Sequence, residues 1–312
     1  MSLYKEYRPQ HLDDVKGNTA VVQGLREHFS QEARRVSHVH LFSGPSGCGK
    51  TTLARIVATD ILGADELSIH EINFAEMRGI DTAREVIERM KGLPLSGNAT
   101  VFILDEAHGM TADAKRAFLK PLEDYPPHVY FFICTTNLDQ LLKGDEGKAI
   151  GTRCTKWKVE PLTARALSAL VMDVAAKENY EVPPELLEAI VDSADGSPRD
   201  ALVGLEAVMP IKNDLPAQLK LLEGGVSMNP DTKELCRLLV GGSGWSAVAP
   251  QLSVLKGKVE PETLRRGILG YCQAVLLKKD NPHIEKVMEE FSVNTYDSGF
   301  PGITIAAWRA TH

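Results

Sequence analysis

Residues Gly44-Pro45-Ser46-Gly47-Cys48-Gly49-Lys50-Thr51 match the phosphate-binding loop pattern G-x-x-x-x-G-K-[ST]. The apolar residues 39–43 before the loop predict a buried strand, and residues 52–58 after it predict a helix. The glycines let successive N–H groups point at a β-phosphate, and the helix N-terminus adds partial positive charge there. A glycine-rich turn without a ligand is the alternative, but it does not explain the Lys-Thr pair at this spacing. The sequence therefore predicts a nucleoside triphosphate site.

Bulk composition is that of an ordinary soluble protein. The chain has 312 residues, of which 43% are hydrophobic and 25% charged, with a formal net charge of -7. This length suggests two or three domains. No segment approaches the ~18 consecutive apolar residues of a membrane span, and the N-terminal residues lack the apolar core of a secretory signal. We therefore expect a cytoplasmic protein, or a nuclear one if the source is eukaryotic, with no membrane partner.

The five cysteines are widely scattered, and no C-x-x-C pair occurs among them. An odd number at such spacings argues against both a disulfide framework and a zinc site.

Further apolar runs alternate with helical patterns. The runs that predict strands are residues 68–73, 101–104, 129–134 and, more weakly, 154–159. Strands rich in Val, Ile and Phe that alternate with helices predict a parallel sheet covered on both faces. Ligands of such sheets bind beyond the carboxyl ends of the strands, which is where the phosphate-binding loop would lie.

The pattern changes after Pro161. Residues 163–208 are helical in pattern, a second break comes at residues 224–230, and more helical segments come after it. We predict a nucleotide-binding core at 1–160, a helical lid at 161–226 and a helical unit at 227–312. The closing residues 296–312 show no assignable pattern.

Polar residues come after two of the predicted strands. Asp105 and Glu106 are directly next to the third strand. Asp105 would hold Mg²⁺ through water together with the Thr51 hydroxyl, and Glu106 would polarise the attacking water as a general base. A solvated acidic turn is the alternative. Asn137 comes after the fourth strand and would donate to a γ-phosphate oxygen or orient water, although an Asn that starts a turn is otherwise unremarkable.

At this point the chain resembles the AAA+ ATPases, and among them the subunits of sliding-clamp loaders. Residues 44–51 correspond to Walker A, residues 103–108 to Walker B and Asn137 to sensor 1. Three further segments narrow the resemblance. Residues 7–9 with 12–18 resemble the segment that covers the adenine. Residues 151–154 resemble the Ser-Arg-Cys motif, and residues 196–202 resemble sensor 2.

The resemblance implies roles for two arginines. Arg153 would reach the ATP of the neighbouring subunit, and Arg199 would touch the γ-phosphate from the lid. A guanidinium is always charged and can bind two phosphoryl oxygens at once, which suits both roles. The alternative for each is a surface ion pair worth roughly 0.5 kcal/mol.

The motifs and the resemblance together assign the site residues. Those for ATP are Tyr7, Arg8, Pro9, Val15, Gly44, Pro45, Ser46, Gly47, Cys48, Gly49, Lys50, Thr51, Thr52 and Arg199. Those for catalysis are Glu106, Lys50, Arg153, Asn137 and Arg199, and those for Mg²⁺ are Thr51 and Asp105.

Residues 78–85 resemble a clamp-loader segment that lines the central DNA channel. Gly79 and Ile80 would begin a helix with Asp81 or Thr82 as its cap, so that free N–H groups would meet phosphate. Arg78 and Arg84 would add positive charge. A capped, solvated helix is the alternative.

The central-helix pair Lys115-Arg116 is open to two interpretations as well. It would face DNA or a neighbour's nucleotide, or else lie on a solvated face.

The sequence departs from the clamp-loader pattern at three places. Thr152 stands where the family usually has Ser, and residues 142–148 look like a short insertion before Arg153. The zinc-binding cysteine cluster of the bacterial γ/τ subunit is absent, which favours the phage, archaeal or eukaryotic small subunits.

The resemblance implies an ATPase subunit that opens a sliding clamp and places it on primer–template DNA during replication. Its partners would be the clamp, primer–template DNA and other clamp-loader subunits, in a pentamer of copies of itself with a different subunit, joined through a C-terminal collar. Two alternatives stay open. One is another AAA+ DNA remodeller, such as a branch-migration motor or helicase loader. The other is a structural subunit that binds nucleotide without turnover.

Overall fold

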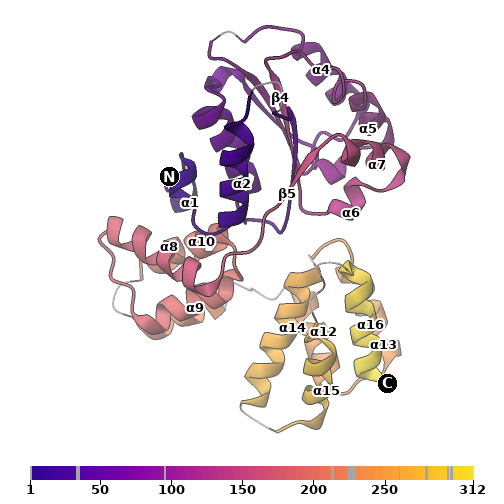
Figure 1. Ribbon diagram of the computed structural model, residues 1–312. Helices are drawn as coiled ribbons and strands as arrows, with labels where there is room; N and C mark the ends of the chain where they lie inside the picture. The colour runs from indigo at the N-terminus through magenta and orange to yellow at the C-terminus, as the bar shows by residue number, and fades with distance from the viewer. Residues whose placement is uncertain are drawn as a thin grey trace. The chain divides into compact units, whose positions relative to one another are not determined.

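The computed structural model describes residues 2–32, 36–94, 96–211, 214–223, 230–259, 261–277, 280–293, 295 and 298–312. The chain divides into two compact units, Met1–Leu222 and Glu223–His312 (Figure 1). The predicted boundary between residues 226 and 227 lies outside the described residues.

A five-stranded, entirely parallel sheet forms the centre of the first unit, as the sequence predicts. The strand order is β2-β3-β4-β1-β5, with β1 between β4 and β5. Because Ser43 pairs with both Thr135 and Lys158, β1, β4 and β5 end at one edge of the sheet. The strands are β1 (Val39–Ser43), β2 (Ile69–Asn73), β3 (Thr100–Asp105), β4 (Val129–Thr135) and β5 (Thr155–Lys158).

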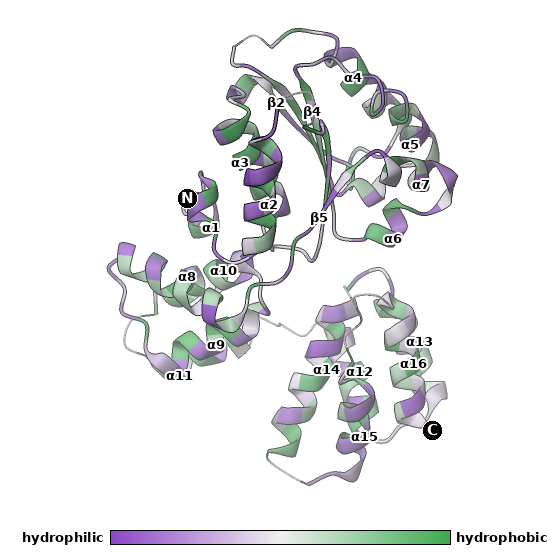
Figure 2. Ribbon diagram, viewed as in Figure 1, coloured by the Kyte–Doolittle hydropathy of each residue, from purple (hydrophilic) through white to green (hydrophobic). Residues whose placement is uncertain are grey.

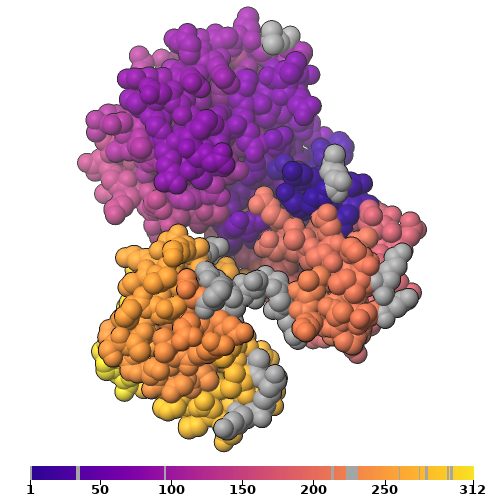
Figure 3. Space-filling model, turned by 180° about the vertical axis from the view of Figure 1, so that it is seen from behind, coloured from indigo at the N-terminus to yellow at the C-terminus, as the bar shows by residue number. Residues whose placement is uncertain are grey.

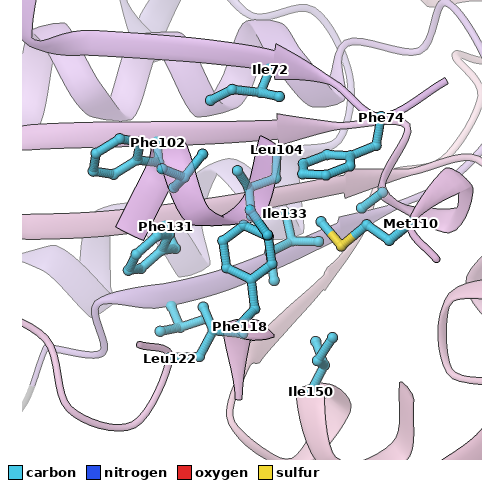
Figure 4. Close-up of a cluster of buried hydrophobic side chains, with 14 of the residues drawn as sticks. Ile72, Phe74, Phe102, Leu104, Met110, Phe118, Leu122, Phe131, Ile133 and Ile150 are labelled. Atoms are coloured by element: carbon cyan, nitrogen blue, oxygen red, sulfur yellow. The ribbon is translucent and has the colours of Figure 1, made fainter. Parts of the chain in front are cut away.

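Helices cover both faces of this sheet (Figure 1). On one face, α2 (Thr19–Phe29) and α3 (Lys50–Ile56) pack against Phe42 and Phe132. On the other face lie α4 (Ile80–Arg89), α5 (Ala112–Phe118) and α7 (Gly144–Thr152), and Figure 4 shows the apolar cluster beneath them. The shorter elements are α1 (Leu3–Glu6), η1 (Leu12–Asp14), the π-helical turn η3 (Val57–Ile61), η4 (Glu66–Ser68), η5 (Ala107–Gly109) and α6 (Leu138–Leu141).

A second apolar cluster in the same unit is formed by the helices after residue 161. These helices are α8 (Ala164–Lys177), α9 (Pro184–Ala194), α10 (Pro198–Val208) and α11 (Leu215–Glu223). Thr163 and Ser197 cap α8 and α10 by accepting hydrogen bonds from backbone N–H groups, as short hydroxyl side chains commonly do. Leu3 of α1 is buried in this cluster, so the N-terminal residues pack with the lid helices. The division at residues 160 and 161 stays a prediction.

All of the regular elements in the described part of the second unit are helices. Its helices are α12 (Pro230–Val240), α13 (Trp245–Leu255), α14 (Pro261–Leu276), α15 (Pro282–Glu290) and α16 (Gly299–Thr311). Apolar and polar residues alternate along them (Figure 2), and the apolar ones form a single core around Leu239, Leu264 and Phe291. Most of the unassigned C-terminal segment forms α16, whose Ile303 and Ala307 join that core.

In the part of the chain that the structure describes, no helix is both long enough and apolar enough to cross a membrane.

A buried histidine lies in the central strand β1. The His40 ring has no solvent exposure, and its Nε2–H donates to the Ser37 carbonyl at 2.7 Å. Its Nδ1 accepts from the Trp157 indole at 3.1 Å, so both ring nitrogens are satisfied in the neutral form. Burial lowers the pKa of His40 to about 3. A charged imidazole at this position is therefore incompatible with the native packing.

Because His40 is buried in its neutral form, we predict that the protein loses stability in mild acid. Unfolding restores the ordinary His pKa of 6.5, so the unfolded chain binds a proton that the folded chain excludes. The free energy of unfolding should fall by about 1 kcal/mol per pH unit near pH 5.5 because of His40. Urea unfolding between pH 7.5 and 5 measures this slope. Glutamine in His40→Gln keeps polar atoms but does not titrate. The slope of the unfolding free energy against pH should therefore be smaller in this variant by that amount. Equal slopes would contradict the assignment, because the neighbouring His28 and His38 titrate in both proteins.

Candidate nucleotide-binding site

The phosphate-binding loop leaves β1 in a conformation that only glycine adopts readily. Gly44, Gly47 and Gly49 have φ angles of +152°, +72° and +100°. Gly49 is the N-cap of α3 and provides no side-chain cap, so the first N–H groups of that helix remain available to an anion. The loop therefore has the local structure that its sequence predicts.

Lys50 lies inside the curve of this loop. Its side chain is buried, and Nζ donates to the carbonyl oxygens of Gly44 at 2.8 Å and Pro45 at 2.7 Å. Burial lowers the pKa of Lys50. An ammonium group has three donors, so one remains for a phosphate oxygen.

Thr51 and Asp105 meet at the edge of the sheet. The Thr51 hydroxyl donates to Asp105 Oδ2 at 2.8 Å, and the backbone N–H of Glu106 donates to Asp105 Oδ1 at 2.9 Å. Mg²⁺ in proteins takes one or two protein oxygens together with phosphate oxygens and water. The hydroxyl and carboxylate of this pair fit such a site.

Glu106 lies beside two polar residues that the sequence analysis did not identify. The Thr136 hydroxyl donates to Glu106 Oε2 at 2.9 Å, and His108 Nδ1 is 3.3 Å from the same oxygen. Burial lowers the pKa of His108, so this ring is neutral at pH 7. The sequence gives one signal for this pair, which is that Thr136 directly follows β4 as Glu106 directly follows β3.

A cavity of about 800 Å³ opens in front of the loop. Its lining brings together predicted residues from four separate parts of the first unit. They are Tyr7, Arg8, Pro9 and Val15 from the N-terminal segment, Ser46, Gly47, Cys48, Gly49, Lys50, Thr51 and Thr52 from the loop and α3, and Asp105, Glu106 and Arg199. Gly44, Pro45, Asn137 and Arg153 lie outside this lining.

Contacts at the cavity wall connect the N-terminal segment with the rest of the first unit. Arg8 Nε donates to the Thr52 hydroxyl at 3.0 Å, and burial lowers the pKa of Arg8. The Tyr7 hydroxyl donates to Glu178, and this hydrogen bond raises the pKa of Tyr7 to about 12. The Arg199 guanidinium carbon lies 5.6 Å from the centre of the Tyr4 ring. Burial also raises the pKa of Cys48 to about 11, so its thiol stays protonated.

Asn137 is the N-cap of α6. Its side-chain oxygen accepts from the Gln140 N–H at 2.9 Å, and its own N–H donates to the Thr135 hydroxyl. This arrangement leaves its side-chain NH₂ group to act as a donor at the sheet edge. Its predicted contact with a γ-phosphate stays a prediction.

Arg153 is the C-cap of α7, a helix that begins within the segment that resembles an insertion. One of its terminal nitrogens donates to the Ala149 carbonyl at 2.8 Å, and the other pairs with Glu123 at 2.8 Å. Its Nε atom is buried and has no hydrogen-bond partner among the residues that the structure describes. Within one chain the guanidinium is thus held outside the lining of its own nucleotide cavity, and its predicted role toward a neighbour stays a prediction.

The residues predicted to meet DNA lie at the start of α4. Arg78 and Gly79 are exposed, and Gly79 is the N-cap residue without any side-chain cap. The prediction that Asp81 or Thr82 caps this helix is therefore wrong. Asp81 instead pairs with Arg84 at 3.0 Å. Free N–H groups at Ile80 and beyond remain compatible with a phosphate contact.

Lys115 and Arg116 differ from each other. Lys115 is buried, and its Nζ donates to the carbonyl oxygens of Gln140 and Leu141, where it satisfies the C-terminal end of α6. Arg116 is exposed and pairs with Glu146 at 2.6 Å. Lys115 is therefore a structural residue, and only Arg116 lies on the surface.

Comparison with known proteins identifies a family and several relatives. Residues 40–146 match the family described as "ATPase family associated with various cellular activities (AAA)". The chain thus contains an AAA domain, built on a P-loop core with a parallel five-stranded sheet.

Relatives of this chain include subunits of DNA polymerase III and of replication factor C. The chain is 28% identical to DNA polymerase III subunit tau of Bacillus subtilis over 94% of its own length and 54% of that protein's. It is 34% identical to the replication factor C small subunit of Haloarcula marismortui, over 65% of this chain and 61% of that protein. It therefore spans less than two thirds of either relative. The replication factor C small subunit of Methanoregula boonei is 26% identical over 91% of this chain and 85% of that protein.

A solved structure with a similar fold is the Thermotoga maritima RuvB Holliday junction branch migration motor. Its TM-score is 0.61 at 21% identity, over 86% of this chain and 91% of that one. At this identity the likeness shows the fold alone.

The geometry of Gly47 predicts that a single methyl group disrupts the site. A Cβ there would lie 2.1 Å from Ser197 Oγ, and the φ of +72° strains any L-residue. Gly47→Ala should weaken the binding of ATP at least tenfold, as measured by calorimetry. Gly270→Ala is the matched control, because a Cβ at this position in α14 meets no atom within 4 Å. Equal affinity in Gly47→Ala and wild type would contradict the proposed closeness of loop and lid.

Proposed function

We propose that the chain is an ATP-hydrolysing subunit of a sliding-clamp loader, which opens a clamp and places it on primer–template DNA during replication. The main support is one cavity whose lining joins the phosphate-binding loop, Asp105 and Glu106, the N-terminal Tyr7-Arg8-Pro9 segment and Arg199 of the lid. Relatives named replication factor C small subunit and DNA polymerase III subunit tau agree with this proposal. A cytoplasmic location, or a nuclear one in a eukaryote, accompanies the same proposal.

ATP binding would use groups that already point into the loop. The N–H groups at the start of α3 and the Lys50 ammonium would hold the phosphates. Tyr7, Arg8, Pro9 and Val15 would cover the base, and Arg199 would reach the γ-phosphate from the lid. Thr51 and Asp105 would hold Mg²⁺, which neutralises charge that develops on the phosphates.

Hydrolysis would depend on Glu106 and on a second chain. The Glu106 carboxylate would take a proton from the attacking water, while the hydrogen bond from Thr136 holds that carboxylate in place. Asn137 would orient the water or the γ-phosphate. Arg153 would leave Glu123 and neutralise transition-state charge on the ATP of the adjacent subunit.

The partners would reflect this dependence on a neighbour. Copies of the chain and a different subunit would form a pentamer, with residues 227–312 as its collar. Arg78, Gly79, Ile80 and Arg84 would contact the DNA backbone rather than base edges, so binding would be sensitive to salt and indifferent to sequence. The alternative class, another AAA+ DNA remodeller, would need no clamp.

The response to clamp and DNA distinguishes these functions. We expect the steady-state ATPase rate of the assembled complex to rise strongly when its clamp and primed DNA are both present. A rate indifferent to them would favour another AAA+ remodeller, and no turnover would favour a structural subunit. A coupled phosphate-release assay with each component omitted in turn measures this.

The proposed role of Arg153 predicts that its removal affects ATP turnover but not ATP binding. Arg153→Ala should bind ATP with wild-type affinity but lose about a thousandfold of the stimulated turnover rate, because a finger supplied in trans contributes to the transition state. The exposed Arg165→Ala on α8 is the control and should leave turnover unchanged. If Arg153→Ala instead failed to bind ATP, its assignment to the neighbouring site would be wrong.

A further inference from the structure

The first residues of the chain are fastened to the lid helix α10. The Ser2 hydroxyl donates to Glu206 Oε2 at 2.8 Å, and the Leu3 N–H donates to the same oxygen at 3.2 Å. Leu3 is only 6% exposed and belongs to the apolar cluster of the lid helices. In Figure 3 the indigo N-terminal residues abut the salmon-coloured part of the lid. Helix α1 is therefore packed as a part of the lid, although the whole sheet lies between them in the sequence.

This packing brings Tyr4 to Arg199. Arg199 and Glu206 are seven residues apart on α10, which is about two helical turns, so both lie on one face of it. Because α1 is fixed to that face through Glu206, the Tyr4 ring lies 5.6 Å from the Arg199 guanidinium carbon. This is within the range of an attractive cation–π contact. Both side chains also line the nucleotide cavity.

Two consecutive residues of the N-terminal segment, Tyr7 and Arg8, contact the lid and the core respectively. The Tyr7 hydroxyl donates to Glu178 at the end of α8, and Lys177 lies over the Tyr7 ring at 5.6 Å. The next residue, Arg8, instead bonds to Thr52 of α3. A rotation of the lid against the core would thus have to be absorbed between Tyr7 and Arg8.

We propose that Tyr4 is a positioning residue for Arg199, and that α1 moves with the lid as the element that carries it. The ring restricts a long, flexible side chain to the orientation that faces the cavity, so less freedom is lost when Arg199 meets a phosphate. The inference rests on the proposed function, because it takes the γ-phosphate as the group that Arg199 meets. It predicts that Tyr4 affects nucleotides with a γ-phosphate and not those without one.

Four variants test this coupling by calorimetry with AMP-PNP and with ADP. Tyr4→Leu keeps an apolar side chain but removes the ring, and should weaken AMP-PNP binding about two- to fivefold while ADP binding stays unchanged. Tyr4→Phe keeps the ring and should bind both nucleotides as the wild type does. The double variant Tyr4→Leu/Arg199→Ala should bind AMP-PNP no more weakly than Arg199→Ala alone, because the two residues act as one unit.

A spectroscopic measurement reports on the contact itself. The Arg199 Nε–H resonance should carry a ring-current shift that survives in Tyr4→Phe and is lost in Tyr4→Leu. Glu6→Gln, an exposed change on α1 outside the cavity lining, is the matched control and should alter neither resonance nor affinity.

Several results would overturn the inference. These are wild-type AMP-PNP affinity in Tyr4→Leu, an equal loss of AMP-PNP and ADP affinity, or strictly additive effects in the double variant. A wild-type protein that binds neither nucleotide would overturn the proposed function first and the inference with it. Failure of the proposed function is seen in the wild type, whereas failure of the inference alone is seen only in the Tyr4 variants, so the two can be told apart.

Discussion

The close approach of the phosphate-binding loop to its surroundings is the constraint on which the site depends. A Cβ at Gly44 would lie 2.0 Å from the Val159 carbonyl oxygen, and one at Gly47 would lie 2.1 Å from Ser197 Oγ. The first contact fixes the loop to the chain that leaves β5, and the second fixes it to the lid. Ser197 is also the N-cap of α10, two residues before Arg199. One buried hydroxyl therefore caps α10 and lies against the loop, two residues before Arg199.

The sheet edge imposes a similar order on the acidic residues. Strands β3 and β4 are paired neighbours, so Glu106 just after β3 and Thr136 just after β4 lie side by side. Glu106 has a φ of +47°, a left-handed conformation that is costly for a residue with a side chain. The hydrogen bonds of Thr136 to its carboxylate and of its N–H to Asp105 help to offset that cost. The backbone turn and the polar neighbours thus specify one orientation for this carboxylate.

The sequence predicts those parts of the molecule that depend on local pattern. The five strands and the phosphate-binding loop have short signals of their own, since apolar runs and glycine spacing act within about ten residues. Thr136 beside Glu106, Tyr4 beside Arg199 and Glu123 beside Arg153 have none, because each pair is 30 or more residues apart and is joined only by the fold. The pattern around Lys115 leaves its role open for the same reason, because the carbonyls that accept its hydrogen bonds belong to α6. Helix α16 begins Gly-Phe-Pro-Gly, which obscures a helical pattern that its packing nevertheless satisfies.

The contacts of Arg153 within one chain determine how readily it could move to the nucleotide of an adjacent subunit. Its partner Glu123 is 67% exposed, and ion pairs of that kind contribute about 0–1 kcal/mol. A phosphate carries more charge than a carboxylate and accepts paired N–H donors, so it would compete well for the guanidinium. Among the described residues the buried Nε is a donor without an acceptor, and movement of the side chain toward a phosphate would give it one. Loss of the Glu123 ion pair would therefore cost little when this arginine is released. Dependence of turnover on assembly would then come from geometry, because the phosphate has to be presented by another chain.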